Sequence, residues 1–115
     1  MSENIVLTSV NDRGIAEVIL NRPDRNNAYN GDMIIELIKS FESLYKNNSV
    51  RVVLIKGNGK HFQAGADLQW LKEIGNLSQK ENIEVSRKTA SAIQGLTKFP
   101  KPTIALIHGG CFGGG

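Results

Sequence analysis

The sequence predicts an α/β fold in which helices connect parallel strands. Residues 32–46 carry apolar side chains at helical spacing, and residues 50–55 and 103–107 are short apolar runs rich in β-forming residues. Buried strands that alternate with helices are typical of a parallel sheet with helical crossovers. The predicted order of elements, strand-strand-helix-strand-helix-helix-strand, therefore indicates the α/β class.

The chain is expected to begin with two antiparallel strands. Residues 5–10 and 15–20 are rich in β-forming side chains, and the sequence Asn-Asp-Arg-Gly at residues 11–14 separates them. This pattern is typical of a β-hairpin. The polar segment that follows, residues 21–27, contains Pro23 and is predicted to form an irregular loop.

A long amphipathic helix is predicted over residues 32–46. Either Asn30 or Asp32 can cap its first turn. The next strand, residues 50–55, is apolar at nearly every position and is expected to be covered on both faces. The helix is defined by apolar residues at positions i, i+3, i+4 and i+7: Ile34, Leu37, Ile38, Phe41, Leu44 and Tyr45.

Two further helices and a final strand complete the predicted order. A short helix is expected over residues 67–74, and Ser78-Gln79-Lys80-Glu81 is a capping-box sequence that opens a second helix reaching about residue 98. The prolines at 100 and 102 end this helix, and residues 103–107 are predicted to form another buried strand. No shift in composition marks a boundary, so residues 1–115 are expected to belong to one domain.

Composition narrows the possible functions. The chain has 115 residues, of which 40% are hydrophobic, and a formal net charge of +3. No apolar run approaches the roughly 18 residues that a membrane span requires. The N-terminus lacks the features of a signal peptide, and the single cysteine cannot form an internal disulfide, so a cytoplasmic location is expected. Lys and Arg are scattered among acidic residues, a pattern that does not indicate a nucleic-acid partner.

Two loops rich in small residues follow predicted strands. One is residues 57–68, and the other contains Gly113, Gly114 and Gly115. Glycine lets a backbone approach a ligand closely with its N–H groups exposed, and such donors bind anions or developing negative charge. The two loops are therefore expected to share one site.

Four motifs, in this order and spacing, resemble the crotonase superfamily of enoyl-CoA hydratases and isomerases. They are Leu-Asn-Arg-Pro at 20–23 with Asn-Ala at 27–28, Val-Val-Leu-Ile-Lys-Gly at 52–57, Phe-Gln-Ala-Gly-Ala-Asp-Leu at 62–68, and Pro-Lys-Pro-Thr-Ile-Ala at 100–105 leading into Gly109 and the triple glycine. The resemblance covers the whole chain. It implies the N-terminal portion of a crotonase-like ββα spiral, with the C-terminal helices absent.

The resemblance also implies an activity and a set of site residues. The backbone N–H groups of Ala64 and Gly114 would form an oxyanion hole for a thioester carbonyl, and an acyl-CoA thioester would be the substrate, in fatty-acid or branched-chain (leucine-type) catabolism. Coenzyme A would be part of the substrate, with no other cofactor and no metal. A full-length protein would be a homotrimer or hexamer. The residues implied in substrate binding are Arg25, Phe62, Ala66, Asp67, Trp70 and Gly113.

Other chemically suggestive residues are interpreted as structural. Asp67 stands where a loop opens into a helix, so it is expected to act as a cap. His61 and His108 have no carboxylate or cysteine at metal-ligand spacing and are expected to be loop or strand-end residues. Cys111 has no partner that would lower its pKa and is expected to be a small packing residue.

Departures from the family pattern leave two alternatives open. The general acid/base carboxylates of hydratases would follow Gly115, so this chain alone is expected to have little or no hydratase activity. One alternative is a non-catalytic truncated remnant with weak or no CoA binding. The other, a phosphate-binding or nucleotide-binding module, rests on glycine content alone, because residues 57–62 complete neither a phosphate loop nor a dinucleotide fingerprint.

Overall fold

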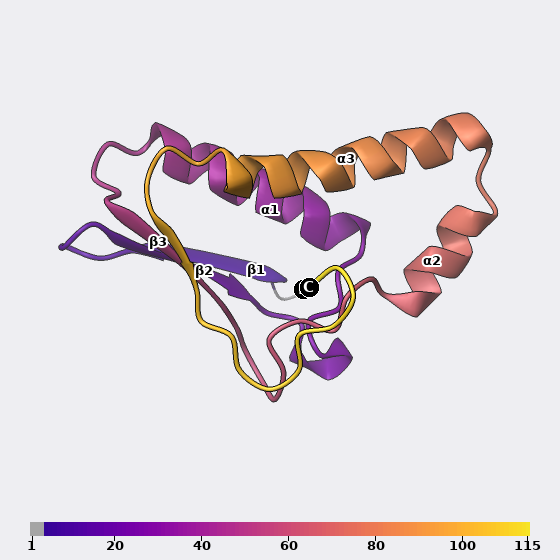
Figure 1. The fold of residues 1–115 in the computed structure, drawn as a ribbon, viewed down its shortest axis with the longest axis horizontal. Coiled ribbons are helices and arrows are strands. Elements are labelled where there is room, and N and C mark those ends of the chain that lie inside the picture. Colours follow the sequence, from indigo (N-terminus) through magenta and orange to yellow (C-terminus); the bar gives the residue numbers. More distant parts are fainter. Residues whose placement is uncertain (1–3) are drawn as a thin grey trace.

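The computed structural model describes residues 4–115 as one four-stranded sheet with helices packed against it (Figure 1). The strands are β1 (Val6–Val10), β2 (Ile15–Leu20), β3 (Val52–Gly57) and β4 (Thr103–Ala105), in the spatial order β1-β2-β3-β4. β1 and β2 are antiparallel, whereas β2, β3 and β4 run parallel to one another. The predicted α/β class is therefore confirmed, with the hairpin at the start and crossovers between the parallel strands.

The helices begin where the sequence places their caps. α1 (Gly31–Lys46) is capped by Asn30, whose side chain accepts a hydrogen bond from the Met33 N–H at 3.0 Å. α2 (Leu68–Gly75) is capped by Asp67, and α3 (Gln79–Thr97) opens with the predicted capping box. A short 3₁₀ helix, η1 (Pro23–Arg25), lies in the predicted irregular loop. None of the helices within residues 4–115 has the length and apolar character needed to cross a membrane.

The hydrophobic core lies between one face of the sheet and α1. Along β2 every second residue is buried, as expected for a strand with one covered face. α3 lies along α1 and contributes little to this core, since Ala92 is its buried residue (Figure 1). The buried residues of the core cluster are Val6, Ala16, Val18, Leu20, Met33, Phe41, Leu44, Val50, Val53, Ile55 and Phe62.

Two predictions about strand burial are wrong. β3 alternates between buried and partly exposed residues, because the helices cover one face of the sheet and the other face carries the ion pair between Lys56 and Glu17 (3.1 Å). β4 is shorter than residues 103–107 and is exposed throughout. Ala105, its last residue, and Ile107, which follows it, border a hollow beneath α3.

The parallel strands bring three loops to one edge of the sheet. They are the β2 loop (residues 21–30), the β3 loop (residues 58–67) and the β4 loop (residues 106–115). Figure 1 shows the yellow β4 loop running beside the segment that follows β3. The carboxyl ends of parallel strands are the usual place for ligand sites in open α/β sheets.

Candidate functional site

The β3 and β4 loops are joined by backbone hydrogen bonds. The Phe62 N–H donates to the His108 carbonyl at 2.9 Å, and the Gln63 N–H donates to the Gly110 carbonyl at 3.3 Å. In return, the Phe112 N–H donates to the Gln63 carbonyl at 3.0 Å. The two small-residue loops that the sequence singles out therefore lie side by side.

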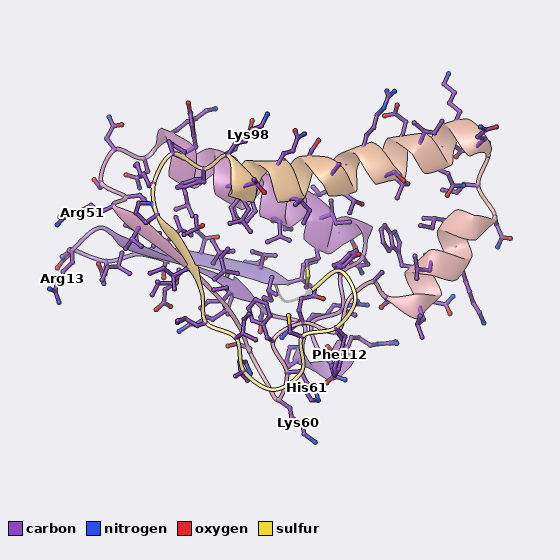
Figure 2. The ribbon with its side chains drawn as sticks, viewed as in Figure 1. Arg13, Arg51, Lys60, His61, Lys98 and Phe112 are labelled. Carbon is purple, nitrogen blue, oxygen red and sulfur yellow. The ribbon has the colours of Figure 1, made fainter. Side chains whose placement is uncertain are left out.

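Histidine side chains add to this contact between the loops. The Gly110 N–H donates to Nδ1 of His61 at 2.8 Å, so that ring nitrogen carries no proton in this arrangement. The His61 ring meets the Phe112 ring edge-on at 6.3 Å, and both project at the end of the molecule where the loops meet (Figure 2). His108 Nε2 lies 2.8 Å from the Gly59 carbonyl. Both histidines are loop residues, as predicted.

Asn27 of the β2 loop holds the β3 loop in place through side-chain hydrogen bonds. It is fully buried, and its left-handed backbone (φ 59°) is one that asparagine tolerates better than most residues. Its side-chain oxygen accepts from the Arg22 N–H at 2.8 Å. Its side-chain nitrogen donates to the carbonyls of Asn58 (2.8 Å) and His61 (3.0 Å). The Asn27 side chain thus fixes the β3 loop at two points, Asn58 and His61.

An ion pair holds the other end of the β3 loop. Arg22 Nη1 lies 2.8 Å from the Asp67 carboxylate and also donates to the Ala28 carbonyl at 2.9 Å. The Trp70 N–H at the start of α2 donates to the same carboxylate, and this bond, followed by Arg22, lowers the pKa of Asp67 despite its burial. Asp67 is therefore a helix cap and a link between loops, which confirms its interpretation as a structural residue.

The proposed donors Ala64 and Gly114 have N–H groups without a hydrogen-bond partner among residues 4–115. Gly65, between the paired segments, has φ +86°, and a Cβ there would approach the Phe112 carbonyl to 3.0 Å. A Cβ on Gly114 would meet the Tyr29 hydroxyl. Glycine at both positions lets the two loops and Tyr29 approach one another closely.

An apolar hollow of about 290 Å³ opens beside Gly114. Its floor comes from the sheet and its roof from α1 and α3, and Phe62 belongs to both its wall and the core. Within residues 4–115, no Asp or Glu lines this hollow. They are Leu20, Tyr29, Ile34, Leu37, Phe41, Ile55, Phe62, Gln63, Thr89, Ala92, Ile93, Leu96, Ala105, Ile107, Gly114 and Gly115.

Three other predicted binding residues gather in a separate polar hollow. Arg25, Asp67 and Trp70 line a space of about 320 Å³ between η1 and α2. Trp70 does not line the apolar hollow, but its ring packs edge-on against Tyr29 at a centroid distance of 5.9 Å, and Tyr29 does line that hollow. The two hollows are thus separated by an aromatic pair.

The remaining predicted residues lie where the loops touch. Ala66 is half-buried and bridges to Tyr29 in a parallel arrangement, and Gly113 lies against Gly65. Cys111 also lies in this contact but is exposed, so the prediction that it packs is wrong. Its side chain belongs to the β4 loop, in which every residue except Gly110 is exposed.

Sequence reasoning missed three residues that build this site: Asn27, Tyr29 and Gln63. Adjacent asparagines, Asn26 and Asn27, are a signal for left-handed backbone, and both adopt it. Gln63 is the one long polar side chain in a run of small residues, which could have marked it as a structural hydrogen-bonding group. Nothing in the sequence indicated that Tyr29 reaches Gly114.

The chain matches known proteins over nearly all of its length. A family model described as Enoyl-CoA hydratase/isomerase matches residues 11–115. The peroxisomal Delta(3,5)-Delta(2,4)-dienoyl-CoA isomerase of Arabidopsis thaliana is 39% identical in an alignment 113 residues long, which covers 90% of this chain and 41% of that protein. The hydroxycinnamoyl-CoA hydratase-lyase of Pseudomonas fluorescens is 39% identical over 107 residues, covering 89% of this chain and 38% of the relative.

Solved structures agree with these relatives. The crystal structure of an enoyl-CoA hydratase from Shewanella pealeana superposes with a TM-score of 0.93 at 37% identity, over 96% of this chain and 42% of that one. The chain spans about 40% of the length of the proteins it matches, as the 41%, 38% and 42% coverages show. With the family model covering nearly every residue, the chain belongs to the enoyl-CoA hydratase/isomerase family of the crotonase superfamily.

Proposed function

We propose that this chain binds an acyl-CoA thioester and polarises its carbonyl group with the N–H groups of Ala64 and Gly114. The observation that carries the proposal is that these two donors, which have no partner within residues 4–115, lie on loops that are hydrogen-bonded together beside an apolar hollow. Family membership supplies the class of substrate. Unpaired backbone donors in a fixed position are suited to a charge that develops during reaction.

The chemistry needs this arrangement because the charge develops on one oxygen. Hydration of an enoyl thioester, or migration of its double bond, passes through an enolate whose negative charge lies on the carbonyl oxygen. Removing one donor from an oxyanion hole costs about 10² to 10³ in kcat. The proposal gives the general acid and base to no residue of this chain, and coenzyme A enters as part of the substrate without a further cofactor.

The two hollows suit the two ends of the substrate. The apolar hollow is proposed to take the acyl chain, since burial of each CH₂ group contributes about 0.8 kcal/mol. The polar hollow is proposed to face the CoA portion, with the exposed Arg25 guanidinium next to a phosphate. Affinity for free CoA that does not fall as salt is added would contradict this role for Arg25.

Finer properties remain predictions from the sequence. A role in fatty-acid or leucine-type catabolism and a homotrimer or hexamer in a full-length protein are expectations of the family resemblance. A cytoplasmic location is an expectation from the N-terminal sequence and the single cysteine. The relatives named above carry both isomerase and hydratase-lyase names, so the choice of reaction is a separate question for this chain.

The test is isotope-edited infrared spectroscopy of a bound thioester. An acyl-CoA with ¹³C at its carbonyl should show a lower C=O stretching frequency when bound than when free, because two N–H groups draw charge onto the oxygen. Binding without a frequency change would contradict the proposal. The same ligand in solution provides the reference frequency.

A matched pair of variants isolates the Gly114 donor. Tyr29→Phe removes the hydroxyl nearest to a new side chain at 114, so Gly114→Ala and Gly114→Pro can both be made in that background. Alanine keeps the N–H and proline lacks it. The proline variant should lose about half of the frequency shift and the alanine variant should retain it, because one of two donors is removed. Equal shifts in both would exclude Gly114 as a donor.

A further inference from the structure

Gln63 makes side-chain hydrogen bonds to two different loops. It is 6% exposed, and its Nε2 donates to the Asn27 carbonyl at 2.6 Å. Its Oε1 accepts from the Gly65 N–H at 2.5 Å. The amide is therefore held in one orientation, with the nitrogen facing a carbonyl and the oxygen facing an N–H.

The backbone groups on either side of the Ala64 N–H are occupied by hydrogen bonds. The peptide group before Ala64 contains the Gln63 carbonyl, which accepts from the Phe112 N–H at 3.0 Å. The N–H after it, on Gly65, is occupied by the Gln63 side chain. Only the Ala64 N–H between them is left without a partner in the described residues, so it remains available to a ligand.

The same residue also supports the second donor. Phe112, which Gln63 holds through its carbonyl, is two residues before Gly114, and the Phe112 carbonyl accepts from the Gly115 N–H at 2.8 Å. A Cβ on Gly115 would come within 2.9 Å of the Gln63 Cβ, which shows how closely the end of the β4 loop packs on this side chain. Gln63 thus contacts the segments on either side of both proposed donors.

We infer that Gln63 is a positioning residue that sets the directions of the Ala64 and Gly114 N–H groups toward one common point. The inference rests on the proposed function, because the purpose of that point is to receive the thioester oxygen. Gln63 itself contributes no group to the substrate carbonyl. Its amide is specifically required, since one end must donate and the other must accept.

Two variants test the inference in the ligand-free chain. Gln63→Met keeps an unbranched side chain of similar length but leaves the Gly65 N–H and the Asn27 carbonyl unpaired. The Gly65 amide should exchange its hydrogen about tenfold faster, as expected for a lost hydrogen bond. The amide resonances of Ala64 and Gly114 should also move. Gln94→Met, the same change at an exposed position of α3, is the control and should leave all three amides unchanged.

The second variant, Gln63→Glu, adds a readout that a merely space-filling side chain would not move. Its carboxylate still accepts from Gly65 but places an acceptor against the Asn27 carbonyl. When the carboxyl is protonated, it can donate there as the amide does. The Ala64 and Gly114 resonances of Gln63→Glu should therefore return toward wild-type positions as pH falls, whereas those of Gln63→Met should not. This variant also keeps the inference testable where methionine disturbs folding.

The outcomes separate the two proposals. Unchanged Ala64 and Gly114 amides in Gln63→Met, or an absence of acid rescue in Gln63→Glu, would overturn the role of Gln63 alone. In the infrared experiment, Gln63→Met should lose about half or more of the carbonyl shift while its affinity for free CoA stays within about threefold of wild type. A wild-type chain with no carbonyl shift would contradict the proposed function, and with it the purpose assigned to Gln63.

Discussion

The two loops that carry the proposed donors are held in place very differently. The β3 loop is largely buried around Phe62, Gln63 and Asp67, and it is fixed by the side chains of Asn27, Gln63 and Arg22. The β4 loop is exposed at nearly every residue, with Phe112 58% exposed. Its main links are hydrogen bonds to the β3 loop itself.

Because of this difference, the two donors depend on different loops for their positions. The peptide group of the Ala64 N–H accepts one hydrogen bond from Phe112 of the β4 loop, but its neighbours are also held by side chains of the β2 and β3 loops. The Gly114 N–H keeps its position only while the β4 loop stays attached to Gln63 and His61. Damage to the β3 loop should therefore disturb both donors, whereas damage to the β4 loop should disturb Gly114 more than Ala64.

The largest effect is expected from Asn27→Ala. The change leaves the Arg22 N–H and the carbonyls of Asn58 and His61 without partners, and it places alanine at a positive φ. We expect the free energy of unfolding to fall by about 3 kcal/mol, measured by urea denaturation. The exposed Asn48→Ala is the control. A decrease in unfolding free energy no greater than that of the control would mean that Asn27 does not fix the β3 loop.

A smaller effect is expected from Asp67→Asn. Asparagine is as good a helix cap as aspartate, so the change mainly removes the ion pair with Arg22 and should cost about 2 kcal/mol near neutral pH. Because the pKa of Asp67 is lowered in the fold, its stabilisation is present above the ordinary aspartate pKa of about 3.9 and is lost as the pH falls through the lower folded value.

The pH dependence sharpens this prediction. The difference in unfolding free energy between wild type and Asp67→Asn should be constant above about pH 5 and should shrink below about pH 4. Asp24→Asn, the same change at an exposed acid in η1, is the control. A difference that persists unchanged into acid would show that the carboxylate charge does not hold this end of the loop.

The smallest effect is expected from His61→Leu, which removes the acceptor of the Gly110 N–H. The cost should be about 1 kcal/mol and should be local to the β4 loop. Amide hydrogen exchange should accelerate at Gly110 and Phe112 while Gly65 stays as protected as in wild type. Equal acceleration at Gly65 would show that the two loops open together, which would contradict the claim that the β3 loop is held more firmly than the β4 loop.

Much of the fold could be predicted because its signals are local. Side-chain caps at Asn30, Asp67 and Ser78 start the three α-helices, and the periodic apolar residues of α1 select its buried face. The burial of β3 and β4 could not be predicted in this way. An apolar strand has the same sequence pattern whether or not a helix covers it. Whether it is covered depends on how elements distant in sequence pack.

The candidate site was predictable only in part for the same reason. The small-residue loops predicted one shared site, whereas the family resemblance implied Ala64 and Gly114 as its two donors, and these two residues stay predictions. The sequence did not reveal that Trp70 and Gly114 belong to different hollows, since Tyr29 lies between them only in three dimensions. The role of Gln63 likewise depends on Asn27, which is 36 residues away in sequence.

The most direct test of the account follows the two amide protons themselves. In ¹H–¹⁵N spectra, the resonances of Ala64 and Gly114 should both move downfield when a non-reacting acyl-CoA thioester binds, because both N–H groups donate to its carbonyl oxygen. Free CoA, which lacks that carbonyl, should leave them nearly unmoved. Resonances that stay in place with the thioester, or that move equally with free CoA, would contradict the claim that these two loops form one site for the thioester oxygen.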